Sequence, residues 1–271
     1  MGGILTDSLA LLADAGHMLS DNASIALALF ALWLSRRPPT PQRSFGFKRA
    51  EILAALVNGV TLVAISIWIF VAAYGRFSDP PDVLGGWMLA IAVAGLFVNV
   101  GAASILWRAG GESLNVSAAF RHVLADLLGS VGVIAAAVII IATGWLYADP
   151  LVSVLIGVLV LASSWTILRD SVSILLESTP AGIDAAELGQ RMASAPGVVE
   201  VHDLHAWTIT SGFPALSAHV LVRRGDDCHA RRRELEQLLA RDYGIEHTTL
   251  QVDHAGEPGT VAVESLRRPS R

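Results

Sequence analysis

Two matching pairs of a histidine and an aspartate lie within apolar segments of the sequence. His17 and Asp21 form the first pair, and His122 and Asp126 form the second, with the same spacing in each. Residues four apart stack on one face of an α-helix, so each pair presents an imidazole and a carboxylate together. Two such helices side by side offer two nitrogen and two oxygen donors, which suits tetrahedral Zn²⁺. One pair alone is equally compatible with a structural hydrogen bond, but the repetition favours a metal site.

These four side chains are ionisable and lie at membrane depth, where such groups usually mark an ion pathway. Zinc needs neutral histidine and ionised aspartate, so metal and protons compete for the same site. We hypothesise that protons entering from outside help to expel the metal, so that the proton gradient drives it out of the cytoplasm. A donor set without sulfur suits Zn²⁺, Cd²⁺ or Co²⁺ better than Cu⁺. Asp14 lies on the same helix face as His17. It either orients a metal ligand without binding the metal itself or caps the outer end of the helix.

The composition indicates a membrane protein with a soluble C-terminal part. Of 271 residues, 53% are hydrophobic and only 16% are charged, whereas soluble domains carry about 25% charged residues. The net charge of −5 argues against a nucleic-acid partner, and the single cysteine, Cys228, excludes a disulfide framework. Five segments are long and apolar enough to cross a bilayer as helices: about 9–34, 48–74, 86–108, 116–145 and 150–176.

The distribution of Lys and Arg predicts the orientation in the membrane. The loop 35–49 carries basic residues and no acid, namely Arg36, Arg37, Arg43, Lys48 and Arg49. The positive-inside rule places this loop and the C-terminal part in the cytoplasm. The start of the first span then lies outside, so we expect that a preceding helix is missing from this sequence. We divide the chain into a transmembrane domain over 1–177, a cytoplasmic domain over 178–255 and a disordered tail over 256–271.

The part after Glu177 predicts a small α+β domain. A helix over 184–193, strands over 198–210 and 215–222, a helix over 228–243 and a strand over 248–252 give the order αββαβ. In an antiparallel arrangement its histidines would converge with Asp253 into a regulatory metal site. The alternative is a set of separate, solvated surface histidines. Six of the eight histidines lie in this part: His202, His205, His219, His229, His247 and His254.

Several stretches resemble the cation diffusion facilitator family, and the resemblance covers about residues 4–253. In family order, they are Ser8–Asp21, Phe45–Glu51, His122–Asp126, Ala148–Pro150 and Val201–Trp207. The sequence is most similar to the bacterial cobalt–zinc–cadmium branch. The resemblance implies a membrane all-α bundle of six helices, of which this sequence has the second to the sixth. It also implies a cytoplasmic αββαβ domain of the metallochaperone, or ferredoxin-like, type.

The resemblance further implies zinc/proton antiport by alternating access, in a homodimer of the bacterial inner membrane. Zn²⁺ is then the substrate and a regulatory ligand, without an organic cofactor. The transport site maps onto the two pairs described above. The cytoplasmic site maps onto four residues of the soluble part: His202, His219, His229 and Asp253. Gln251 stands where some members have a histidine, and we place it, like Asp14, beside the ligands rather than among them.

Two other functions stay open on the sequence alone. A chain without the family's first helix would fit a transport-incompetent, membrane-anchored metal-binding or sensor subunit. An intramembrane hydrolase using Asp or His is the other alternative. No Gly-x-Gly-Asp or Gly-x-Ser-x-Gly stretch occurs in any predicted span, so we expect that the protein is not an enzyme.

Overall fold

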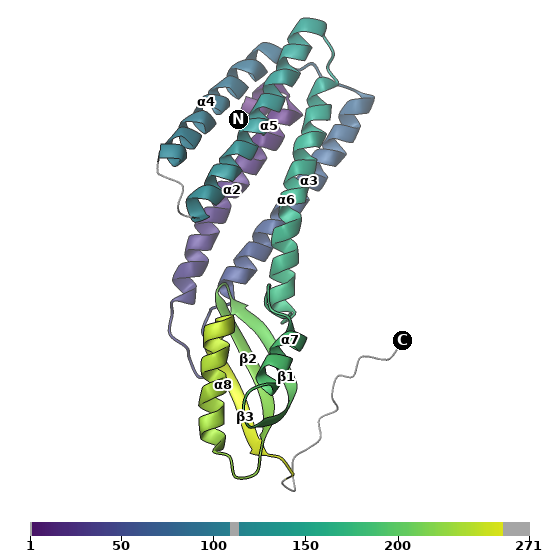
Figure 1. Ribbon diagram of the computed structural model, residues 1–271. Coiled ribbons are helices and arrows are strands. Elements are labelled where there is room, and N and C mark those ends of the chain that lie inside the picture. Colours follow the sequence, from purple (N-terminus) through teal and green to yellow (C-terminus); the bar gives the residue numbers. More distant parts are fainter. Residues whose placement is uncertain (1, 109–113, 257–271) are drawn as a thin grey trace. The chain divides into compact units, whose positions relative to one another are not determined.

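The N-terminal two thirds of the chain consist of helices. The structure, a computed structural model, describes residues 2–108 and 114–256, without the side chains of 106–122 and 125. A short helix, α1 (Gly2–Thr6), precedes five long ones (Figure 1). These are α2 (Leu9–Ser35), α3 (Ala50–Ser78), α4 (Gly85–Arg108), α5 (Leu114–Thr143) and α6 (Ala148–Leu175). Within the described residues, five helices are long and apolar enough to cross a membrane, which agrees with the predicted number.

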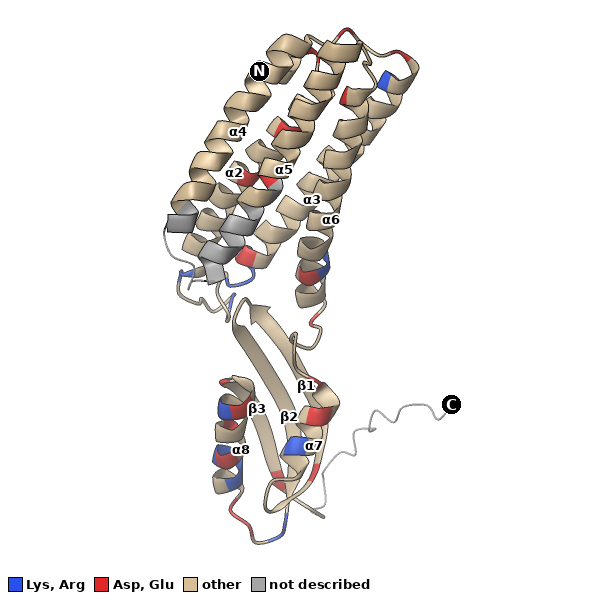
Figure 2. Ribbon diagram, turned by 45° about the horizontal axis from the view of Figure 1, so that its top comes forward, with Lys and Arg blue, Asp and Glu red and all other residues tan. Residues whose placement is uncertain are grey.

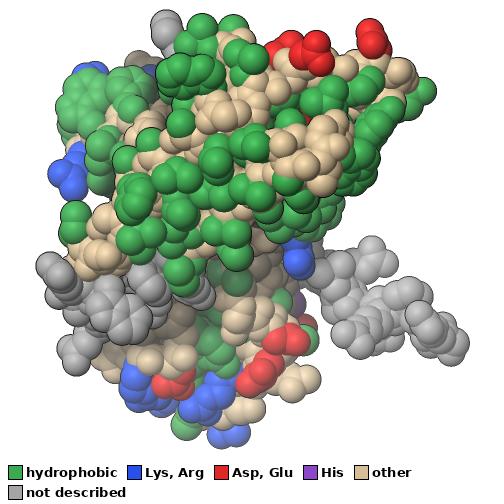
Figure 3. Space-filling model, turned by 90° about the horizontal axis from the view of Figure 1, so that it is seen from above, with side chains coloured by type: hydrophobic (Ala, Val, Ile, Leu, Met, Phe, Trp, Pro, Cys, Tyr) green, Lys and Arg blue, Asp and Glu red, His purple; other side chains and the backbone are tan. Residues whose placement is uncertain are grey.

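The long helices expose apolar side chains and carry few charges along their length (Figures 2 and 3). Large side chains such as Leu19, Phe97 and Trp165 are about 70% exposed, at 72%, 71% and 68%. In water such surfaces would drive association, whereas lipid tails match them in polarity. Small residues allow close approach between helices. At Gly157, an added Cβ atom would lie 2.7 Å from the ring of Phe70 on α3.

The chain divides into two compact units, one formed by Met1–Leu29 with Ala55–Leu168 and the other by Phe30–Ala54 with Arg169–Arg271. The first unit has an apolar core to which α2, α5 and α6 contribute buried side chains, including Leu11, Val133 and Ile156. Polar pairs also join its helices. Asn99 on α4 donates to Ser130 on α5 over 3.3 Å, and both are buried.

The second unit contains a three-stranded sheet in the order β1–β2–β3 (Figure 1). Its elements are α7 (Ala185–Ala193), β1 (Val198–Thr210), β2 (Phe213–Val222), α8 (Cys228–Tyr243) and β3 (His247–His254), which confirms the predicted αββαβ order. Leu216, Ala218, Val220 and Val222 alternate along β2 into a core with α7 and α8. Both helices therefore cover the same face of the sheet, and neither of them covers the other face, which we call the open face.

The strand directions differ in part from the antiparallel arrangement that the sequence suggested. Strands β1 and β2 form an antiparallel hairpin, but β2 and β3 run parallel. The reason is that α8 lies between β2 and β3 in the chain, and such a crossover returns the strand in the same direction. The predicted disordered tail lies outside the described residues from 257 onward.

Candidate metal centres

The first turn of α2 is held by a buried aspartate from the start of α6. Asp149 is fully buried, and its carboxylate accepts hydrogen bonds from the backbone N–H groups of Leu9 at 2.9 Å and Ala10 at 3.1 Å. The hydroxyl of Ser8 donates to the same carboxylate over 2.6 Å and accepts from the N–H of Leu11 at 3.2 Å. Free N–H groups at a helix start need such partners, and in a membrane water does not supply them.

A cation from a third helix completes this cap. Arg76, near the end of α3, approaches the Asp149 carboxylate over 3.3 Å and that of Asp7 over 2.7 Å. The same guanidinium also donates to the backbone carbonyl of Asp7. The network therefore ties the starts of α2 and α6 to the end of α3. It fixes the helix that carries His17 and Asp21, a role that sequence analysis did not assign to Asp149.

Three of the four predicted transport ligands gather between α2 and α5. The imidazole Nε2 of His17 lies 3.6 Å from an oxygen of Asp21 and 3.5 Å from an oxygen of Asp126. All three side chains are largely buried, with exposures of 17%, 23% and 12%. The backbone of His122 lies in α5, one turn before Asp126, but its side chain lies outside the described residues.

These separations fit a tetrahedral zinc ion. Ligands at about 2.0–2.2 Å from tetrahedral Zn²⁺ lie roughly 3.3–3.6 Å from one another. The ligand atoms of His17, Asp21 and Asp126 all lie within 4.8 Å of one another. Among the described residues this is the one group of three or more metal-binding side chains that gathers so closely. A fourth ligand on the same face of α5 as Asp126 would complete the coordination.

Asp14 lies one turn before His17 on α2 and faces α5. An added Cβ atom at Gly129 would lie 3.5 Å from a carboxylate oxygen of Asp14. Gly129 therefore leaves room on α5 for this carboxylate, three residues after Asp126. This placement is compatible with the predicted role of Asp14 beside the ligands.

The residues of the predicted cytoplasmic site are only partly brought together. His202 on β1 pairs with His219 on β2, and their ring centroids are 5.4 Å apart. His219 in turn pairs with Gln251 on β3, whose amide donates to Asp253 over 2.8 Å. Paired residues share a face of a sheet, so these four side chains form a row on the open face.

A bulge at Asp203 adds further polar groups to this row. Asp203 has a φ of +51°, a left-handed conformation that non-glycine residues rarely adopt. The register of β1 shifts between His202 and His205, so both histidines lie on the open face although they are three residues apart. Asp203 contacts His205 over 2.9 Å and approaches His219 to 3.8 Å. Strict alternation, the only signal in the sequence, would have separated the two histidines.

His229 lies at the start of α8 and is exposed. Within the described residues, no three of His202, His219, His229 and Asp253 place ligand atoms within 4.8 Å of one another. The start of α8 is instead capped by Asp227, which accepts from the N–H groups of His229 at 2.9 Å and Ala230 at 3.1 Å. These bonds, chiefly that from Ala230, lower the pKa of the Asp227 carboxyl.

Comparison with known families places this arrangement in a class of membrane transporters. Residues 1–176 match the family described as "Cation efflux transmembrane domain". Residues 180–255 match the family described as "Cation efflux protein, cytoplasmic domain". The chain therefore belongs to the cation efflux, or cation diffusion facilitator, family, as its sequence motifs suggested. It is a multi-pass protein of the bacterial inner membrane with a cytoplasmic C-terminal domain.

Individual relatives narrow the branch to transporters of zinc, cadmium and cobalt. The chain is 49% identical to "Zinc transporter ZitB" of Shigella flexneri, over 94% of this chain and 82% of that one. It is 44% identical to a "Cadmium, cobalt and zinc/H(+)-K(+) antiporter" of Bacillus velezensis, over 94% and 83%. It is 42% identical to "Metal cation efflux system protein CzcD" of Cupriavidus metallidurans, over 94% and 81%. This chain is accordingly a metal cation efflux protein.

Proposed function

We propose that this protein exports Zn²⁺ from the cytoplasm in exchange for protons, with His17, Asp21, His122 and Asp126 as the transport site. The observation that carries the proposal is the gathering of three ligand atoms on two membrane helices, at the separations of a zinc coordination shell. The names of the relatives support zinc, cadmium and cobalt as substrates, and one of them includes H⁺.

The geometry explains how protons and metal exchange at one place. Nε2 of His17 lies between carboxylate oxygens of Asp21 and Asp126. A proton on this nitrogen would make the imidazole a cation that lies within ion-pair distance of both carboxylates. When Zn²⁺ binds, the same nitrogen and the same oxygens become its ligands, so the proton must leave. Occupancy by proton and by metal is mutually exclusive, which is the requirement for coupled exchange through alternating access.

A homodimer with regulatory zinc at the cytoplasmic domain extends the proposal. His202, His219 and Asp253 lie on the open face of the sheet, with Gln251 between them and His229 apart on α8. A site that is incomplete within one chain is compatible with completion by a second protomer. The open sheet face is a suitable surface for that protomer, since the helices leave it uncovered within one chain.

The test is zinc uptake into inverted membrane vesicles under an imposed pH gradient. The wild type is compared with Asp126→Asn, which removes a ligand charge with little change in size. Asp82→Asn, at an exposed aspartate in the loop between α3 and α4, is the matched control. We expect gradient-dependent uptake in the wild type and the control and none in Asp126→Asn. Uptake driven by a K⁺ gradient alone would reject the proton as the exchanged ion.

The alternative of a transport-incompetent sensor subunit has no support from the relatives, whose names describe transport or efflux. The same vesicle assay also decides it. Zinc binding without uptake in either gradient, by protein that is folded in the membrane, would reject the transport proposal.

A further inference from the structure

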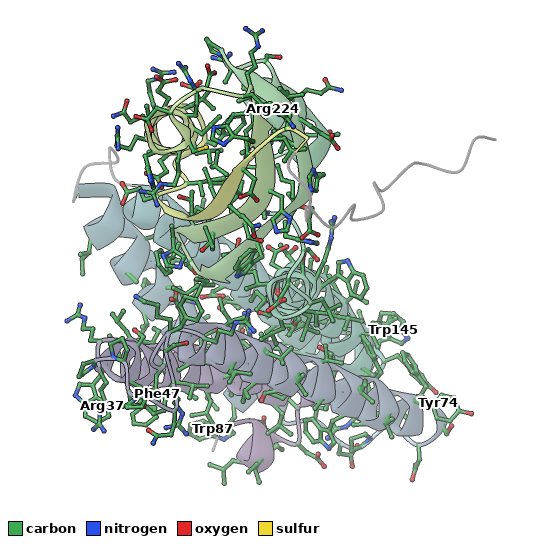
Figure 4. All side chains as sticks on the ribbon, turned by 90° about the horizontal axis from the view of Figure 1, so that it is seen from below. Arg37, Phe47, Tyr74, Trp87, Trp145 and Arg224 are labelled. Atoms are coloured by element: carbon green, nitrogen blue, oxygen red, sulfur yellow. The ribbon has the colours of Figure 1, made fainter. Side chains whose placement is uncertain are left out.

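The segment between α2 and α3 is expected at the membrane surface. It comprises residues 36–49 and joins two helices that each cross the bilayer, so it lies at the membrane surface. Trp33 precedes it by less than one helical turn, and tryptophan is enriched at the level of the lipid headgroups. Arg37 and Phe47 mark the two ends of the segment in Figure 4. The position of Trp33 and the positive-inside rule favour a place for its basic side chains near the headgroups of the cytoplasmic leaflet.

Three of these basic side chains make cation–π contacts with aromatic rings and no ion pairs with carboxylates of the described residues. The guanidinium of Arg37 lies 4.3 Å from the ring of Trp33, and that of Arg43 lies 4.4 Å from the ring of Phe47. The ammonium of Lys48 lies 4.9 Å from the ring of Phe213. In the described part of the chain, none of the three cations pairs with a carboxylate. An aromatic ring orients a cation but leaves its charge unneutralised.

Two of these cations line a cavity within the second unit. The cavity measures about 960 Å³ and lies between the α2–α3 segment and strand β1, with Arg43, Lys48, Arg49 and His205 in its wall. Its one lining carboxylate is Glu177, which Arg49 already pairs with over 2.8 Å. Nearby, Glu51 is engaged by the hydroxyl of Thr210. The cavity therefore has uncompensated positive charge, with Ser44 available as a neutral donor.

We propose that this cavity binds the phosphate group of an anionic phospholipid of the cytoplasmic leaflet, with Arg43 and Lys48 as the charged partners. Its volume is within the range of about 300–1,000 Å³ that small-molecule sites occupy. The charge selects a phosphate, and the position at the membrane surface favours a lipid over a free anion. The ligand is distinct from the transported metal.

Lipid preference is measured on the full chain in nanodiscs that contain phosphatidylcholine and a minor fraction of spin-labelled phosphatidylglycerol. We expect the wild type to enrich the labelled anionic lipid relative to a spin-labelled phosphatidylcholine. The double variant Arg43→Gln/Lys48→Gln is expected to lose about fivefold in this preference for each cation removed. The double variant Arg232→Gln/Arg233→Gln on α8 removes the same charge elsewhere and is expected to keep the preference.

A second variant and the wild type alone test the proposal if Arg43→Gln/Lys48→Gln does not fold. The exchanged pair Arg43→Lys/Lys48→Arg keeps both charges and is expected to retain most of the preference. Absence of enrichment in the wild type overturns the proposal without any variant. Equal loss in both charge-removing variants shows a general surface effect and also overturns it. Binding of inorganic phosphate at the cavity without any enrichment of the labelled lipid assigns the cavity to a free anion and rejects the lipid.

Discussion

Replacement of Asp149 by asparagine should strongly destabilise the protein, because this carboxylate is fully buried. The fully buried carboxylate accepts from two backbone N–H groups, a hydroxyl and the guanidinium of Arg76. In Asp149→Asn one oxygen remains and can keep the bonds from Ser8 and Ala10. The amide nitrogen then faces the N–H of Leu9, which loses its acceptor, and the guanidinium of Arg76, which keeps only its contacts with Asp7.

The expected cost follows from these two losses. A buried donor left without a partner costs about 1–3 kcal/mol, and removal of one partner from a buried ion pair costs about 3–5 kcal/mol. Asparagine is a partial replacement and Arg76 keeps Asp7 as a partner, so we expect a decrease of about 2–4 kcal/mol in the free energy of unfolding. With roughly 2–4 °C per kcal/mol for a chain of this size, Tm should fall by about 10 °C.

The assay is thermal unfolding of purified protein in detergent without zinc, with Asp82→Asn as the exposed control. The double variant Asp149→Asn/Arg76→Gln should lose less stability than the sum of the two single variants, because each single change already breaks the contact between Asp149 and Arg76. The same variant should lower zinc transport, since the cap positions α2. A Tm of Asp149→Asn equal to that of Asp82→Asn would show that the cap is not a significant stabilising element.

Three further predictions rest on other parts of the structure. Gly157→Ala should cost about 1–3 kcal/mol, because the new Cβ atom would meet Phe70 at 2.7 Å, and Phe70→Leu in the same chain should recover part of the Tm. Gln251→His should raise zinc binding by the cytoplasmic domain in isothermal titration, since the new imidazole would stand beside His219 in the row on the open face; unchanged binding would reject this row as a metal site. Asp227→Asn should lower Tm at neutral pH, and the difference from the wild type should disappear in acid. The pKa of the Asp227 carboxyl in the folded protein lies below its ordinary value of 3.8. The ionised carboxyl therefore stabilises the fold above pH 3.8, and this stabilisation is lost as the pH falls through the folded pKa.

Local sequence patterns predicted the long helices and the shared helix face of His17 and Asp21 well. The five apolar segments correspond to five long helices, although α3 continues to Ser78, beyond the predicted end at 74. The spacing of His17 and Asp21 fixes both on one face of α2 whatever surrounds the helix. Apolar length and i, i+4 spacing are properties of a single helix, so the sequence alone contains them.

The contacts that join distant segments required the folded structure. The sequence gives no pairwise signal that Asp149 caps a helix that begins some 140 residues earlier. It likewise does not tell that α8 returns β3 parallel to β2, or that a bulge at Asp203 brings His202 and His205 to one face. These features depend on which elements pack together and on a local departure from alternation.

The sequence by itself thus determined the family, the membrane helices and the types of ligand, because these depend on composition and on short-range periodicity. Only the tertiary structure decided that α2 and α5 bring His17, Asp21 and Asp126 within coordination distance. It also decided that basic residues of the α2–α3 segment line a cavity with the cytoplasmic sheet. The physical reason is that helix packing and strand register result from burial and hydrogen bonding over the whole chain. A short sequence motif, by contrast, determines only which residues share a face of one helix or strand.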